Sequence, residues 1–292
     1  MIKIPEFNIQ KDDWIDGKLL YGNKLGKKIR EQLAEKVATS KVTPGLAVLL
    51  VGEDPASKVY VSHKEKAAAE LGFHSIIQRL PEESTQEAVL KQIEEWNNDS
   101  KIHGILVQLP LPKHINERTV LQQILPEKDV DGFHFENIGR LYAKSRGTIP
   151  CTPLGIMVMI QQAGIDCTGK NAVVLGRSNL VGKPIAQMLM DVGQATVTIC
   201  HSRTKDLAAH VSSADILVSA MGVRGLVKPE DIKQGAVVID VGMHRTDAGL
   251  CGDLDYKEMI DKSSFITPVP KGVGPMTISM LMYNTYNNAI GE

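Results

Sequence analysis

The chain has 292 residues, and a length beyond the usual size of one hydrophobic core favours two α/β domains over a single one. Its 33 basic and 34 acidic side chains nearly cancel, which argues against a nucleic-acid partner. The four cysteines form no CxxC pair and no apolar run approaches the ~20 residues of a membrane helix, so we expect no disulfide framework, no metal cluster, no membrane partner and a cytoplasmic location.

The first half of the chain alternates apolar and amphipathic segments. Residues 18–37 carry apolar side chains at helical spacing, which predicts an amphipathic helix. Apolar, β-rich runs then alternate with helical segments, and this pattern predicts right-handed βαβ units around a parallel sheet. We place the strands at 45–52, 74–80 and 104–110 and the helices at about 57–71 and 85–97.

A loop rich in glycine and proline at 144–153 marks the expected domain boundary. A second α/β series follows it, with strands predicted at 171–176, 195–200, 215–220 and 235–242 and helices at about 154–163, 184–192 and 205–211. We therefore predict domains at 1–147 and 148–274 that flank a cleft. A last helix at about 275–289 is expected to pack, with the rest of 275–292, on the first domain.

The sharpest local motif is NAVVLGRSNLVGKPIAQML, in which a buried strand ends at Gly176 and a helix begins at Pro184. Gly176 and Gly182 allow a backbone to approach a pyrophosphate closely, and a helix start offers free N–H groups. The spacing is not GxGxxG, but the strand–loop–helix order is that of a Rossmann half.

The end of the next strand indicates which dinucleotide would bind. NAD enzymes usually place an acidic residue there, whereas this chain has His201, Ser202, Arg203 and Thr204. Arg177 in the preceding loop adds a forked cation suited to a 2′-phosphate. These residues favour NADP over NAD. The alternative is that both arginines are solvated loop charges.

Four polar residues of the first half are candidates for chemistry. Tyr60 and Lys64 are four residues apart and share a helix face that follows the carboxyl end of a strand, where open α/β sheets bind ligands. Gln108 interrupts the apolar run GILVQLP, and Asp131 lies with Asp129 in the turn-forming segment PEKDVDGFH. The alternatives are a surface pair, an internally satisfied glutamine and a solvated loop.

Nine motifs occur in order between about residues 45 and 285, namely YVSHK, GILVQLPLP, PEKDVDGFHFENIGRL, IPCTP, GRSNLVGKP, TICHSRT, AMGVRGLV, IDVGMHR and TPVPKGVGPMT. Together they resemble the bifunctional methylenetetrahydrofolate dehydrogenase/cyclohydrolase family of the FolD type. The resemblance implies an N-terminal α/β catalytic domain and a C-terminal Rossmann-type NADP-binding domain. It also implies a homodimer in one-carbon metabolism, including the supply of purine biosynthesis.

The implied reactions are the oxidation of 5,10-methylenetetrahydrofolate by NADP to 5,10-methenyltetrahydrofolate and its hydrolysis to 10-formyltetrahydrofolate, without a metal. The resemblance gives Lys64 the central cyclohydrolase role, with Tyr60 shaping the folate pocket, Gln108 tuning the lysine and Asp131 binding the pterin. It adds Pro270 and Gly272 to the substrate site. The expected cofactor-binding residues are Gly176, Arg177, Ser178, Val181, Gly182, His201, Ser202, Arg203 and Thr204.

A lysine that moves protons near pH 7 needs a pKa about 3 units below its ordinary value, or about 4 kcal/mol, so we expect an apolar pocket around Lys64. Gly272 and Gly274 are expected to use backbone angles closed to other residues. The family usually has glycine where this chain has Lys271; a positive φ there would add about 1 to 3 kcal/mol of strain. We interpret His201, His244 and Met276 as packing or cofactor-edge residues.

Three other functions remain open from the sequence. One is a dehydrogenase with weak cyclohydrolase activity, which the presence of Tyr60, Lys64 and Gln108 disfavours. Another is an NADP-sensing or scaffold protein. The third is an unrelated two-domain dehydrogenase of a small acid, because a fold does not determine a function.

Overall fold

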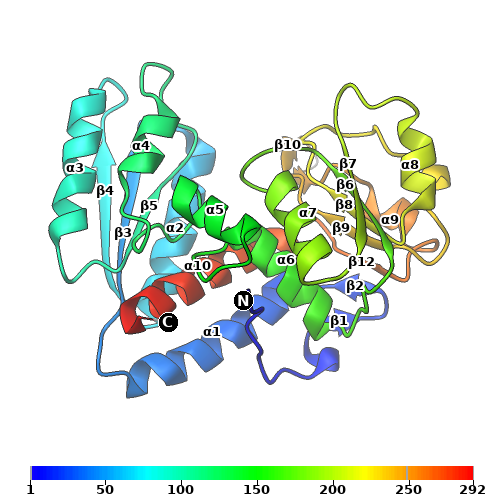
Figure 1. Ribbon diagram of the computed structural model, residues 1–292, viewed down its shortest axis with the longest axis horizontal. Coiled ribbons are helices and arrows are strands. Elements are labelled where there is room, and N and C mark those ends of the chain that lie inside the picture. Colours follow the sequence, from blue (N-terminus) through cyan, green and yellow to red (C-terminus); the bar gives the residue numbers. More distant parts are fainter. Residues whose placement is uncertain (1, 248, 292) are drawn as a thin grey trace. The chain divides into compact units, whose positions relative to one another are not determined.

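In the computed structural model, the strand β3 (Gly45–Val51) is buried along its whole length because both faces of its sheet are covered. It lies between β4 (His74–Leu80) and β5 (Gly104–Val107), and both pairings are parallel, as predicted. Alternate residues of β3 share a hydrophobic core with α3 (Gln86–Asn98). Figure 1 shows α3 on one side of these strands and α2 (Pro55–Glu70) on the other.

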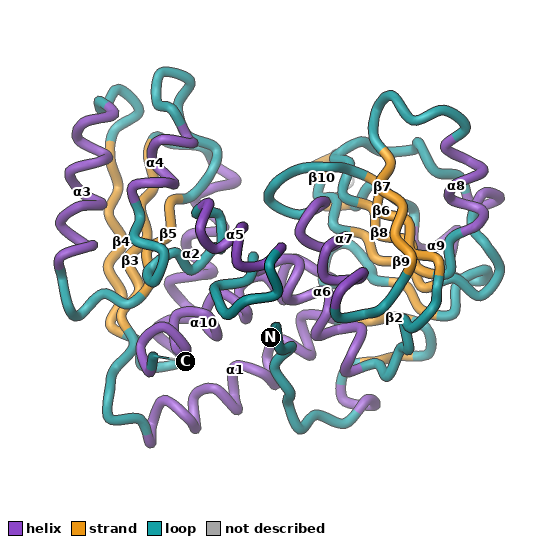
Figure 2. Tube along the Cα trace, viewed as in Figure 1, coloured by secondary structure: helices purple, strands orange, loops and turns teal. Residues whose placement is uncertain are grey.

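A second sheet has seven strands in the order β1-β2-β12-β9-β8-β6-β7. Figure 2 shows its central strands side by side, and every pairing is parallel except that of β1 with β2. The strands are β1 (Ile15–Asp16), β2 (Leu19–Leu20), β6 (Asn171–Leu175), β7 (Thr196–Cys200), β8 (Ile216–Ser219), β9 (Val237–Asp240) and β12 (Phe265–Ile266). Their carboxyl ends form the edge at which an open α/β sheet binds ligands.

Helices and a separate two-stranded hairpin accompany this second sheet. Figure 1 shows α7 (Gly182–Asp191) on one side of the strands and α8 (Leu207–Ser213) and α9 (Tyr256–Met259) on the other. Two short strands, β10 (His244–Thr246) and β11 (Gly249–Cys251), pair as a hairpin. Further elements are the short 3-10 helices Lys11–Asp13 and Pro229–Asp231 and α6 (Cys151–Gln162).

The chain divides into two compact units. The seven-stranded unit contains Met1–Lys28 and Thr152–Thr277, and the three-stranded unit contains Ile29–Cys151 and Ile278–Glu292. Two helices, α1 (Gly22–Thr39) and α10 (Val273–Ile290), run from one unit into the other. Structural detail is described for residues 2–247 and 249–291, so the expected outer limits at 1 and 292 lie outside the described residues.

The expected first domain differs from this division at the amino terminus. Residues up to 28 belong to the seven-stranded unit, because Leu19 of β2 pairs with Ile266 of β12. Lys18 Nζ also donates to the carbonyls of Ile260 and Asp261, both at 3.0 Å. The helix predicted from 18 therefore begins only at Gly22.

The end of α10 lies on the three-stranded unit. Asn284 donates to the carbonyl of Val130 at 2.9 Å and to that of Ile149 at 3.0 Å, and Asn288 donates to the carbonyl of His103 at 3.3 Å. Two helices of this unit, α4 (Glu117–Gln123) and α5 (Phe135–Tyr142), were not predicted. Among the helices of the described residues, none combines the length and the apolar character needed to cross a membrane.

Candidate active site

The helix α2 places the first two candidate residues. Asp54 accepts a hydrogen bond from the backbone N–H of Ser57 at 2.7 Å and so caps the helix that Pro55 begins. Tyr60 and Lys64 follow one turn apart on the same face, as the spacing predicted. Lys64 is only 8% exposed, so its ammonium group is held in the interior rather than in solvent.

Gln108 lies against Lys64 at the end of β5. Lys64 Nζ donates to Gln108 Oε1 at 2.9 Å, while Gln108 Nε2 donates to the carbonyl of Leu109 at 2.7 Å. The backbone N–H of Gln108 also donates to the carbonyl of Leu49 in β3 at 2.8 Å. The amide is thus fixed at both ends, and its oxygen can only face the lysine.

The two aspartates of the segment PEKDVDGFH have different roles in the structure. Asp129 is 2% exposed, and its carboxylate accepts from the backbone N–H groups of Gly132 (3.0 Å) and His134 (2.8 Å) and from Asn137 Nδ2 (2.9 Å). These bonds give the loop its shape. Asp131 is half-buried in the same loop and lies close enough to Lys64 for their charges to interact.

Burial dominates the electrostatics of this site. It lowers the pKa of Lys64, and the nearby charge of Asp131 only partly opposes that shift. It also raises the pKa of Asp131 to about 6, with Lys64 acting in the opposite direction. Burial likewise raises the pKa of Tyr60. The lysine is therefore desolvated, and the amine and carboxyl groups both shift toward their neutral forms.

Two further residues adjoin this site and were not predicted as part of it. Cys151 follows the proline of the IPCTP motif, and burial raises the pKa of its thiol, with the charge of Asp131 adding to the shift. Asn284 of α10 donates to Cys151 Sγ at 3.5 Å and to the carbonyls of Val130 and Ile149. One amide thus ties together the loops that carry Asp131 and Cys151. The motif indicated the cysteine, but no local pattern marks the asparagine.

The loop after β6 carries the second group of candidates. Gly176 has φ of 112°, and a Cβ there would lie 2.3 Å from the carbonyl oxygen of Ala220, so only glycine fits. Ser178 Oγ accepts from the backbone N–H groups of Val181 (3.1 Å) and Gly182 (3.3 Å). The expectation of free N–H groups at the helix start is therefore wrong for these two residues.

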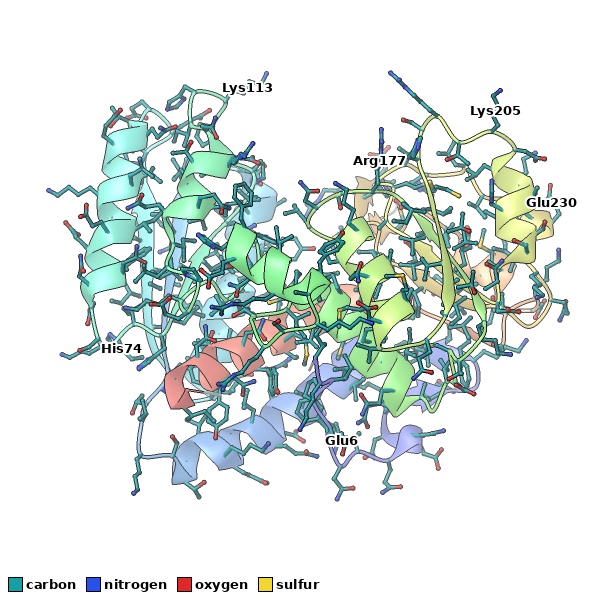
Figure 3. The ribbon with its side chains drawn as sticks, viewed as in Figure 1. Glu6, His74, Lys113, Arg177, Lys205 and Glu230 are labelled. Carbon is teal, nitrogen blue, oxygen red and sulfur yellow. The ribbon has the colours of Figure 1, made fainter. Side chains whose placement is uncertain are left out.

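The same loop still presents donors to solvent. Among the described residues, the backbone N–H groups of 177–180 donate no hydrogen bond. The hydroxyl of Ser178 keeps its own proton to donate, and the exposed side chain of Arg177 projects from the loop (Figure 3). The helix begins at Gly182 rather than at Pro184, which lies within the first turn, where a missing N–H breaks no helical bond.

The tip of β7 forms a closed turn beside this loop. The backbone N–H of Thr204 donates to the carbonyl of His201 at 2.8 Å, and the N–H of His201 donates to Thr204 Oγ1 at 2.9 Å. Arg203 N donates to His201 Nδ1 at 3.1 Å. These bonds leave the side chains of Ser202 and Arg203 exposed at a strand end next to Gly176, whose N–H donates to the carbonyl of Cys200 at 2.9 Å.

Pro270 and Gly272 lie in the seven-stranded unit, whereas Tyr60, Lys64, Gln108 and Asp131 lie in the three-stranded unit. Lys271 has φ of 89°, which confirms that this position requires the left-handed conformation that glycine adopts easily. The expected special backbone angles of Gly272 and Gly274 are wrong, because neither has a positive φ. A Cβ on Gly272 would instead lie 2.4 Å from the carbonyl oxygen of Pro268.

Comparison with protein families gives two matches along the chain. Residues 20–131 match the catalytic domain of tetrahydrofolate dehydrogenase/cyclohydrolase, and residues 150–291 match the NAD(P)-binding domain of the same family. The two matches together cover most of the sequence and lie in different segments. The chain thus resembles that family across its whole organisation and not only at one motif.

Individual relatives agree with these matches. The bifunctional protein FolD of Geotalea daltonii is 53% identical over 276 residues, covering 93% of this chain and 98% of the relative. The crystal structure of the FolD dehydrogenase/cyclohydrolase of Campylobacter jejuni is 46% identical with a TM-score of 0.91, covering 94% and 98% of the two chains. The Trypanosoma brucei enzyme, solved with NADP and an inhibitor, is 39% identical with a TM-score of 0.89, covering 94% and 97%.

Proposed function

The chain belongs to the tetrahydrofolate dehydrogenase/cyclohydrolase family, and we propose that Lys64 moves protons in the hydrolysis while the loops after β6 and β7 bind NADP. The enzyme oxidises 5,10-methylenetetrahydrofolate to 5,10-methenyltetrahydrofolate with NADP and hydrolyses that product to 10-formyltetrahydrofolate. The observation that carries the assignment of Lys64 is its buried amine, oriented by Gln108 beside Asp131.

The residues of the seven-stranded unit fit a dinucleotide with a 2′-phosphate. Gly176 lets the backbone of its loop pack against the carbonyl of Ala220 and puts no side chain at the strand end, which suits close approach of a pyrophosphate. The exposed guanidinium groups of Arg177 and Arg203 and the hydroxyl of Ser202 supply donors around the ribose phosphate. The first carboxylate after β7, that of Asp206, caps α8 instead of facing a ribose diol. NADP held by these residues would supply the hydride acceptor for the oxidation.

The substrate's own nitrogen lone pair assists loss of the hydride from the methylene carbon, so the protein chiefly aligns the two reactants. Asp131 is suited to hold the pterin because a carboxylate can accept hydrogen bonds from two adjacent N–H groups. Tyr60 lies one helical turn before Lys64 and contributes a partly buried ring to the same helix face. These residues bind and orient the folate without taking part in the transfer of the hydride.

Hydrolysis requires protons to move in two steps. A water oxygen bonds to the methenyl carbon and loses one proton, which gives a neutral hydroxyl adduct. The bond from that carbon to N5 then breaks as N5 gains a proton, and the hydroxyl loses its remaining proton as the formyl C=O forms. The neutral amine of Lys64 takes the proton from water and its ammonium form returns one to N5, while the net reaction releases one proton. Burial makes this exchange accessible because it lowers the pKa of Lys64.

Gln108 orients the lysine rather than setting its pKa. A hydrogen bond to the amide oxygen favours the charged ammonium, so it acts against the effect of burial. Its fixed geometry instead directs Nζ and limits the rotamers that the long side chain can adopt. The alternative of a dehydrogenase with weak cyclohydrolase activity is not favoured, since the relatives are bifunctional.

The direct test uses the purified 292-residue chain in two assays. Incubation with 5,10-methylenetetrahydrofolate should produce NADPH with NADP and much less product with NAD. Incubation with 5,10-methenyltetrahydrofolate alone should produce 10-formyltetrahydrofolate, since the hydrolysis needs no dinucleotide. A preference for NAD would reject the assigned phosphate site, and absence of hydrolysis would reject the assigned role of Lys64.

The same proposal extends to the assembly and location of the enzyme. The family resemblance suggests a homodimer that works in the cytoplasm on tetrahydrofolate derivatives, with neither nucleic acid nor membrane as a partner. Light scattering of the purified protein should give about twice the mass of the chain, and fractionation of cells should recover the protein with the cytoplasmic enzymes. A monomeric mass or recovery with membranes would contradict these points.

A further inference from the structure

Two buried carboxylates at the carboxyl edge of the seven-stranded sheet have no role in the reactions described above. Asp240 ends β9 and is 1% exposed, and Asp253 follows the β10–β11 hairpin and is 2% exposed. Burying a carboxylate is costly unless hydrogen bonds replace its hydration. Both residues have such bonds, and the donors come from the loops that leave this edge of the sheet.

Asp253 joins two of those loops. Its Oδ2 accepts from Ser219 Oγ at 3.1 Å, from Met221 N at 2.9 Å and from Gly222 N at 3.1 Å. Its Oδ1 accepts from His244 Nε2 at 2.7 Å. One side chain therefore fixes the loop after β8 and also ties it to the residue that begins β10.

Asp240 fixes Asp253 in turn. Its Oδ1 accepts from the backbone N–H of Asp253 at 3.2 Å and from that of Gly242 at 2.9 Å, and its Oδ2 accepts from Leu254 N at 2.9 Å. The backbone at Gly242 leaves no room for a side chain beside Asp253, because a Cβ on Gly242 would lie 2.2 Å from Asp253 Oδ1. Despite its three N–H donors, burial raises the pKa of Asp240 to about 6. So dense a network holds the loops in one arrangement.

The sheet order indicates which part of a dinucleotide meets these loops. β6 lies between β7 and β8, so the strand order reverses there, and a dinucleotide binds across such a reversal. The proposed 2′-phosphate site lies at the end of β7 and the pyrophosphate site at the end of β6. The nicotinamide half must then extend over the ends of β8 and β9, where the loops joined by Asp253 begin.

We infer that Asp253, together with His244, is a positioning residue for the nicotinamide end of NADP in the dehydrogenase reaction. It acts through the backbone of Met221 and Gly222, which it holds at the strand end, and does not itself contact the reacting atoms. The inference rests on the proposed cofactor site. It predicts that loss of this pair impairs hydride transfer more than it impairs recognition of the adenosine half.

The test compares Asp253→Ala with the conservative Asp253→Asn. The alanine variant should lower kcat for NADPH formation at least tenfold, while cyclohydrolase activity, which needs no dinucleotide, stays within twofold. The Kd of adenosine 2′,5′-bisphosphate, which lacks nicotinamide, should also stay within twofold. Asp253→Asn should restore kcat to within threefold of wild type, because the amide oxygen still accepts from Met221 and Gly222 and its nitrogen can donate to the ring of His244.

A second pair keeps the test decisive if Asp253→Ala fails to fold. His244→Leu should lower kcat for NADPH formation at least threefold, and His244→Gln, whose amide can donate from nearly the position of Nε2, should not. Asp215→Asn is the matched control, because Asp215 accepts from Asn171 N at the opposite, amino edge of the same sheet. It should leave kcat unchanged.

Two results would overturn the inference. One is unchanged kcat in folded Asp253→Ala or, where that variant is unfolded, in His244→Leu. The other is equal weakening of NADP and adenosine 2′,5′-bisphosphate binding with no recovery in Asp253→Asn, which would indicate a general loss of structure. A wild-type chain that fails to bind the bisphosphate would instead reject the cofactor site on which the inference rests.

Discussion

Lys64 Nζ lies 2.9 Å from Oε1 of Gln108, and the other end of that amide is bound to the carbonyl of Leu109. A buried amine is thus oriented by a neutral group that is itself fixed by the backbone at the end of β5. A carboxylate in the place of Gln108 would hold the lysine as a permanent ammonium ion. The neutral partner leaves the amine free to exchange a proton.

The pH dependence of the hydrolysis should report this amine. Because burial lowers the pKa of Lys64, the neutral base becomes available at a lower pH than for an exposed lysine. The rate, corrected for uncatalysed hydrolysis, should rise with pH through an ionisation whose pKa lies below 10.5, the ordinary value for lysine. Stopped-flow measurements of Lys64→Arg, which stays protonated, should lack that rise. An identical profile in wild type and variant would contradict the assignment.

Asp131→Asn should stabilise the protein while weakening folate binding. The pKa of this carboxyl is raised from 3.8 to about 6, so the folded state holds the proton more tightly than the unfolded chain. That stabilisation is complete below about pH 4 and is lost as the pH rises to about 6. The neutral amide should therefore raise the free energy of unfolding by about 1–3 kcal/mol at pH 7 and by almost nothing near pH 4.

Thermal melts of wild type and Asp131→Asn across this pH range measure the difference. The KM for 5,10-methylenetetrahydrofolate should rise about 10–100-fold in the same variant, because a carboxylate accepts charge-assisted hydrogen bonds that an amide cannot. A variant that is less stable than wild type at pH 7 would contradict a destabilising effect of the Asp131 carboxylate on the fold. An unchanged KM would contradict its role in binding the substrate.

Arg177→Ala should change cofactor choice. Removal of a guanidinium that contacts a phosphate costs about 1.5–3 kcal/mol, so the KM for NADP should rise about 10–100-fold. The KM for NAD, which lacks the 2′-phosphate, should change less than twofold. Lys205→Ala is the matched control, since Lys205 is another exposed cation in this unit (Figure 3). An equal loss for both dinucleotides would show that Arg177 does not read the 2′-phosphate.

Lys271→Gly should relieve local strain. A lysine at φ of 89° has a conformational strain of about 1–3 kcal/mol. Glycine removes most of this strain but costs about 1 kcal/mol, because the unfolded chain gains conformational entropy. We expect a gain of up to about 2 kcal/mol in the free energy of unfolding. Lys271→Ala keeps the Cβ and should show no gain, so a gain of equal size in both variants would assign the effect to the lost charge.

Much of this architecture could be predicted from local patterns. The apolar run of β3 predicted a strand of a parallel sheet, and the four-residue spacing of Tyr60 and Lys64 placed them on one helix face. The order of the motifs then predicted that Tyr60 and Lys64 share a site with Gln108. The polar side chain of Gln108 is also unusual in an apolar run. Such features depend on neighbours in sequence, which periodicity detects.

The missed features depend on partners distant in sequence. Leu19 joins β2 to a strand some 250 residues later, and a two-residue strand has no periodicity to detect. Asn284 looks like one of several polar residues of α10 until its acceptors around Cys151 are seen. Ser178 resembled a phosphate ligand only, whereas its oxygen also satisfies the N–H groups at the start of α7.

The central claim is that the hydrolysis needs proton transfer by Lys64 whereas the hydride transfer does not. The variant Lys64→Met tests this claim most directly. Methionine keeps an unbranched apolar side chain of similar length but cannot carry a proton. Both activities should be measured on the same folded preparation, with wild type and Asp215→Asn alongside. We predict that hydrolysis of 5,10-methenyltetrahydrofolate falls at least 100-fold while NADPH formation retains at least a tenth of the wild-type rate. Equal loss of both activities, or retained hydrolysis, would contradict the account.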